Sequence, residues 1–103
     1  MDGDNAAAAT RRIRLAALSK AENAGELRDE ILACKGADLE IDGSDVEFLS
    51  GLSVQVLLAA REMWRLDGVD FRIEDPSETL RADLSLFGLP GMLAVQTLEG
   101  ASA

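Results

Sequence analysis

The residues capable of chemistry are few in this sequence and widely spaced. It contains no histidine and a single cysteine, Cys34, so it offers no Ser-His dyad, no imidazole base or ligand, and no cysteine pair for zinc or a disulfide. The glycine-rich patterns GxGxxG and GxxxxGK[ST], which bind phosphates, do not occur. Asp42 and Asp45 flank a turn, where carboxylates are more often solvated than metal-bound. We therefore expect a protein that is not an enzyme and has no catalytic residues, metal or cofactor.

The composition narrows the classes of partner. The formal net charge of −9 repels phosphate backbones and anionic lipid headgroups and favours basic protein partners. No run of about 18 apolar residues is present, so we expect no membrane insertion. Cys34 follows Ile31, Leu32 and Ala33, which indicates a small core residue in a reducing, cytoplasmic compartment.

The sequence predicts strands and helices that alternate along the chain, and these elements must position any functional site. The 103 residues suit one domain, and we expect a disordered leader at 1–11, a single domain at 12–98 and a tail at 99–103. Strands are predicted around Ile13, at 37–42 and at 69–74, where apolar and charged residues alternate. Helices are predicted at 20–34, capped by Ser19 and Glu22, at 50–66, from Ser77 to 87, and as a short segment within 89–98. This order predicts an α/β domain with a small, mixed or mainly parallel sheet and helices mostly on one face.

The helix at 50–66 has the most regular pattern. At 100° per residue, one broad arc is apolar and contains Leu52, Val56, Leu57, Ala59, Ala60, Met63 and Trp64. The opposite arc is polar, but Val54 and Leu58 fall toward it. Trp64 is predicted to lie in the core.

A set of short segments, in this order, resembles the STAS family. They are 39–42 (LEID), 46–52 (VEFLSGL), 56–60 (VLLAA), 71–77 (FRIEDPS) and 84–89 (LSLFGL). The family includes anti-sigma-factor antagonists, the cytoplasmic tails of sulfate transporters and small subunits of lipid-transport ATPases. The stretch from Gly51 to Ala60 also looks like the small STAS proteins encoded with bacterial chemotaxis genes.

The resemblance implies a docking site at the start of this helix, where many relatives carry a phosphorylatable serine in an Asp-Ser-Ser-Gly turn. Here Ser50 stands at the Asp position, Gly51 at the first Ser, Leu52 at the acceptor and Ser53 at the Gly. Leu52 has no hydroxyl, so the resemblance does not extend a phosphate switch to this position. Ser50 and Ser53 are alternative phosphosites, although Ser50 is better explained as the helix N-cap.

We interpret the chain as a non-catalytic signalling adaptor. Its partner is expected to be a chemotaxis histidine kinase or an anti-sigma-factor-like kinase, with the adaptor itself a monomer or weak dimer. The alternatives are a cytoplasmic STAS subunit of a lipid-transport ATPase and an anti-sigma-factor antagonist. The hypothetical partner-binding face, motivated by the two apolar residues on the polar arc, comprises Ser50, Gly51, Val54, Gln55, Leu58, Arg61 and Glu62.

Overall fold

The computed structural model describes residues 10–88 and places three parallel strands in one sheet, in the order β1-β2-β3. The strands are β1 (Arg11–Arg14), β2 (Leu39–Asp42) and β3 (Phe71–Glu74). Ile13 lies opposite Ile41, which lies opposite Ile73. Because side chains alternate across a strand, this register gathers the apolar residues of all three strands on one face.

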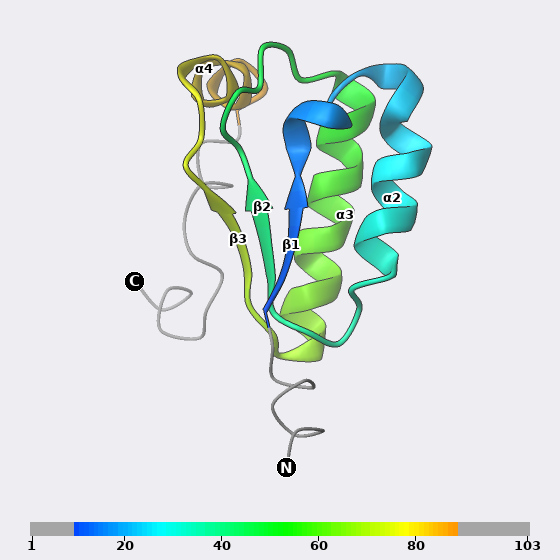
Figure 1. Ribbon diagram of the computed structural model, residues 1–103. Coiled ribbons are helices and arrows are strands. Elements are labelled where there is room, and N and C mark those ends of the chain that lie inside the picture. Colours follow the sequence, from blue (N-terminus) through cyan, green and yellow to red (C-terminus); the bar gives the residue numbers. More distant parts are fainter. Residues whose placement is uncertain (1–9, 89–103) are drawn as a thin grey trace.

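The helices cover that apolar face and one end of the sheet. Two short 3-10 helices, η1 (Leu15–Ala17) and η2 (Ala21–Asn23), lead into α2 (Ala24–Leu32). The long helix α3 (Gly51–Asp67) lies beside α2 behind the strands, and α4 (Glu78–Leu86) lies beyond the carboxyl ends of β2 and β3 (Figure 1). The α/β class and the one-sided arrangement of the helices are confirmed.

The core lies between the sheet and the helices α2 and α3. Its largest fully buried side chains include Trp64 and Phe71, whose rings meet edge to face at 6.1 Å between centroids. The indole Nε1–H of Trp64 donates to the carbonyl of Ala37 at 2.7 Å, which satisfies the polar atom of a buried ring. Trp64 and Cys34 are both core residues, as their sequence context predicted.

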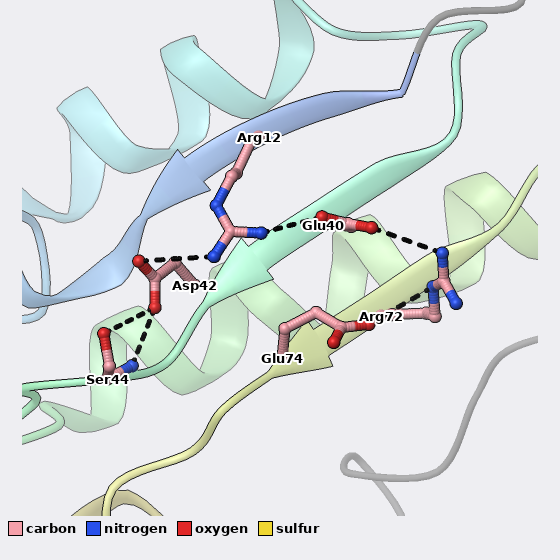
Figure 2. Close-up of polar contacts among 6 residues, drawn as sticks. All are labelled: Arg12, Glu40, Asp42, Ser44, Arg72 and Glu74. Carbon is pink, nitrogen blue, oxygen red and sulfur yellow. Dashed lines mark hydrogen bonds and ion pairs between the residues drawn. The ribbon is translucent and has the colours of Figure 1, made fainter.

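Ion pairs occupy the opposite face of the sheet. Glu40 on β2 accepts from Arg12 on β1 at 2.8 Å and from Arg72 on β3 at 3.3 Å, so it bridges all three strands (Figure 2). Asp42 and Glu74 extend the arrangement, at 3.6 Å from Arg12 and 3.5 Å from Arg72. With Arg14, the strands place three arginines and three carboxylates on this face, so their charges balance, and no strand residue within 10–88 adds a large apolar side chain to it.

The predicted start of α2 was wrong. The structure has η2 before α2, and neither element has a side-chain cap. Ser19 is buried, and its carbonyl is occupied by α3: it accepts from Ser50 N at 2.9 Å and from Ser53 Oγ at 3.0 Å. Ser19 therefore contacts the start of α3 through its carbonyl, and the predicted capping box between Ser19 and Glu22 is not formed. The short helix predicted within 89–98, the tail and residues 1–9 of the leader lie outside the described residues; β1 begins at Arg11.

Candidate docking site at the start of helix α3

The loop from Gly43 to Ser50 positions the start of α3 and is held at several points. Gly43 donates from its backbone to Glu74 at 2.8 Å and accepts from Ser77 N at 3.0 Å. The Ser77 hydroxyl donates to the carbonyl of Val46 at 2.7 Å. Leu49 N donates to the Asp83 carboxylate on α4 at 3.1 Å. The loop is therefore a defined surface and not a free connection, because α4 and β3 fix its backbone.

The loop also needs glycine at position 43. A Cβ there would lie 2.7 Å from Leu80 Cδ2 and 3.1 Å from the Cα of Pro76. Leu80 is fully buried and Pro76 Cα is backbone, so a Cβ at position 43 would force packed atoms to shift. The close approach brings the end of β2 against the turn that leads into α4.

Two buried serines close the first turn of α3. Ser50 is the N-cap, and its Oγ accepts from Ser53 N at 3.0 Å. The two hydroxyl oxygens lie 2.8 Å apart, and Ser53 Oγ donates to Ser19 O at 3.0 Å. Since the Ser53 hydrogen is used on Ser19, the Ser50 hydroxyl donates to Ser53. The hydroxyl hydrogens of Ser50 and Ser53 therefore both have acceptors, and the N-cap role of Ser50 is confirmed.

Large apolar side chains are exposed around this closed turn. Phe48 on the loop is 57% exposed and Leu52 in the first turn is 53% exposed. Gly51, Gln55, Leu58 and Glu62, which follow one another at spacings of three and four, are exposed along the same helix. They share one outer strip because residues three and four apart are neighbours on a helix surface.

The structure divides the predicted binding residues into exposed and buried members. Val54 is only 4% exposed and belongs to the core, and Ser50 is buried as the cap. Arg61 is half-buried at the edge of the strip. Glu62 accepts a bidentate pair of hydrogen bonds from Arg65, at 2.6 and 3.1 Å, and this contact lowers the pKa of Glu62.

The predicted apolar arc was rotated relative to the observed core face of α3. The buried residues of α3 are Ser53, Val54, Leu57, Ala60 and Trp64, so Val54 faces inward and Leu52 outward. Burying Ser53, which pairs with Ser19, turns the helix by about one residue from the arc that hydrophobicity alone selects.

Phe48 was missed as a surface residue. It alternates with Val46 in sequence, a pattern that fits a strand end or an extended loop, and the structure forms a loop in which Val46 is buried and Phe48 is exposed. The charged neighbour Glu47 was consistent with either arrangement. The next residue, Leu49, is anchored to Asp83 across 34 positions, and no local sequence pattern indicates this contact.

The two turn carboxylates have protein partners. Asp42 Oδ1 accepts from Ser44 Oγ at 2.7 Å and Ser44 N at 3.0 Å, and these bonds, with the nearby Arg12 and Arg14, lower the pKa of Asp42. Asp45 pairs with Arg14 at 3.2 Å. Across residues 10–88, no group of three or more potential ligands could hold a metal ion.

Comparison with known families decides what kind of domain carries this site. The family model described as "Mlab, STAS domain" matches residues 3–95. The chain belongs to the STAS domain family. STAS domains are generally non-catalytic regulators that interact with protein partners. No curated protein and no solved structure matches the chain in the two other comparisons. None of the helices within residues 10–88 is long and apolar enough to cross a membrane.

Proposed function

We propose that this STAS domain is a non-catalytic adaptor that binds a protein partner through the start and outer strip of α3. We name this the entrance surface and define it as Phe48, Gly51, Leu52, Gln55, Leu58 and Glu62. The observation that carries the proposal is the pair Phe48 and Leu52, two large apolar side chains more than half exposed on a rigidly held turn. Such side chains, rimmed by polar groups, are typical of interaction sites.

Binding at this surface is expected to be constitutive. Leu52, at the position where relatives carry the acceptor, has no hydroxyl. Ser50 and Ser53 are buried with both hydroxyls engaged, so a kinase would have to unfold the first turn to reach either. A phosphate at this turn would add about two negative charges, and this chain lacks an exposed hydroxyl in that turn to receive it.

The proposed partner is a signalling kinase, with a chemotaxis histidine kinase as the specific candidate. The resemblance of residues 51–60 to STAS proteins encoded with chemotaxis genes supports this choice, and the net charge of −9 favours a partner surface with basic residues. A second candidate is an ATPase of a lipid-transport system, which the chain would join as a subunit. An apolar surface without an exposed phosphorylation site favours this second candidate, because a permanent subunit does not need to be released from its complex by phosphorylation.

A partner-capture experiment with matched variants tests the proposal. The full chain, Leu52→Asp and Leu66→Asp are immobilised, and the retained proteins are identified by mass spectrometry. Aspartate in the first turn of a helix suits the helix dipole, so Leu52→Asp should stay folded while it removes an apolar contact. Leu66 is 70% exposed near the other end of the same helix and controls for loss of an exposed leucine.

The outcomes separate the candidates. A histidine kinase retained by the wild type and Leu66→Asp, but not by Leu52→Asp, supports the proposal. A transport ATPase with the same pattern, recovered in fixed stoichiometry, supports the second candidate. Equal retention by all three proteins contradicts the placement of the docking surface.

A further inference from the structure

A groove between α2 and α3 opens next to the entrance surface. It has a volume of about 350 Å³ and includes small residues, Ala24 and Gly25 on α2 and Ala59 on α3. Leu32, Leu52 and Met63 also line it, and the two leucines are 42% and 53% exposed. The two helices lie side by side behind the sheet (Figure 1). Small residues with larger apolar walls let another helix approach closely.

The groove is continuous with the entrance surface through two residues. Leu52 and Gln55 belong to both, so a partner that covers the start of α3 also meets the groove. Gly25 has no atom within 4 Å of the place its Cβ would occupy, which means that the α2 side is open to an incoming chain.

Charge indicates what kind of helix would fit. The exposed carboxylates on η2 and α2 are Glu22, Glu26, Asp29 and Glu30. The same stretch has one cation, Arg28, which lines the groove and bonds to Asp29 at 3.2 Å. The carboxylates lie next to the groove and do not line it. With four carboxylates and one paired cation, η2 and α2 are acidic as a whole, and they complement a helix with basic residues beside them.

We propose that this groove takes an amphipathic helix of the protein partner, with its apolar face in the groove and lysines or arginines beside α2. The inference rests on the proposed function and adds the partner's recognition element. Helices that bind in grooves insert apolar residues at spacings of three, four and seven, and α2 offers 9 residues of wall length. At 1.5 Å per residue this corresponds to about 13 Å, or two to three turns of the bound helix.

The test uses synthetic peptides and the full chain. The probe is an 18-residue peptide of leucine and lysine arranged as an amphipathic helix; its control has the same composition with the leucines spread around the helix. Binding is followed by 15N NMR at the amides of Gly25 and Ala59. Ala59→Gln places a neutral polar side chain in the groove. Ala33→Gln makes the same change at an exposed alanine outside the residues that line the groove, and thermal unfolding confirms that both variants are folded.

The amphipathic peptide is expected to shift both amides, and Ala59→Gln to weaken its binding about tenfold while Ala33→Gln leaves it unchanged. Equal binding of the control peptide would overturn the inference, because charge alone would then explain the interaction. Shifts confined to other residues would also overturn it. The same amide shifts on concentrating the chain without peptide would assign the groove to a second copy and contradict the inference.

A parallel capture experiment distinguishes this inference from the proposed function. Phe48 is on the entrance surface but does not line the groove. If Phe48→Asp loses the natural partner and Ala59→Gln keeps it, the groove inference fails and the proposed function stands. If both variants keep the partner, the entrance surface is contradicted. Loss of the partner by both variants supports both proposals.

Discussion

Replacing Ser53 with alanine tests whether the buried serine triad holds the start of α3. The Ser53 side chain is fully buried, donates to Ser19 O at 3.0 Å and lies 2.8 Å from Ser50 Oγ. In the variant, Ser19 O still accepts from Ser50 N at 2.9 Å. The Ser50 hydroxyl hydrogen, however, loses its acceptor inside the protein.

The magnitude follows from these contacts. A lost neutral hydrogen bond costs about 1 kcal/mol, and an unsatisfied buried donor costs about 1 to 3 kcal/mol. Ser53→Ala should therefore reduce the free energy of unfolding by about 2 kcal/mol. Ser50→Ala removes the N-cap and should cost about 1 kcal/mol. The double variant leaves no orphaned hydroxyl, so it should cost about 2 kcal/mol, which is less than the sum of the single changes.

Urea unfolding provides the assay, with the fluorescence of Trp64, the sole tryptophan, as the signal. For a chain of this size, with an m-value of about 1 to 1.5 kcal/mol per molar urea, Ser53→Ala should lower the midpoint by between ~1 and ~2 M. A loss below about 0.5 kcal/mol, or a double variant that equals the sum of the singles, would refute the assignment of the hydrogens.

Three further changes test other parts of the account. Gly43→Ala should destabilise the fold by about 1 to 3 kcal/mol through overpacking, and an unchanged urea midpoint would show that the loop adjusts. Trp64→Phe removes the donor to Ala37 O and should cost about 1 to 3 kcal/mol by circular dichroism; a neutral effect would mean that water replaces it. The pKa of Asp42 is lowered by Ser44, so its ionised form stabilises the fold above the unfolded pKa, and this contribution is lost as the pH falls through the folded value. Asp42→Asn should therefore flatten the stability profile below about pH 4, and an unchanged acid limb would contradict this.

Helices and strands could be predicted from the sequence where nearby residues fix their ends or their buried face. Ser50 and Ser77 cap α3 and α4 through bonds to residues three positions on. Gly68 ends α3 in a left-handed conformation, with φ of 73°, which glycine adopts without strain. The alternation of Leu39 and Ile41 predicted the buried face of β2 because a strand has a period of two. The α/β class followed from the order of these elements.

The site depends on contacts that no local pattern contains. Ser19 pairs with α3 across 34 positions, and this pairing both removes the predicted cap of α2 and turns Ser53 inward. Val54 follows Ser53 into the core, and Leu52 is left on the surface. Phe48 is exposed on a loop whose neighbouring backbone, at Leu49, is held by Asp83 on α4. The pattern of apolar residues predicted Leu52 inside and Val54 outside, because such a pattern does not indicate that a polar residue such as Ser53 is buried.

The most direct test of the central claim is the dissociation constant of the captured partner for four proteins: wild type, Phe48→Asp, Leu52→Asp and Leu66→Asp. Burial of a leucine or phenylalanine side chain is worth about 1.5 to 3 kcal/mol, which corresponds to a loss of affinity of at least about tenfold. The account predicts that loss for Phe48→Asp and Leu52→Asp, with Leu66→Asp within about twofold of the wild type. Equal constants for all four folded proteins would contradict docking at the start of α3.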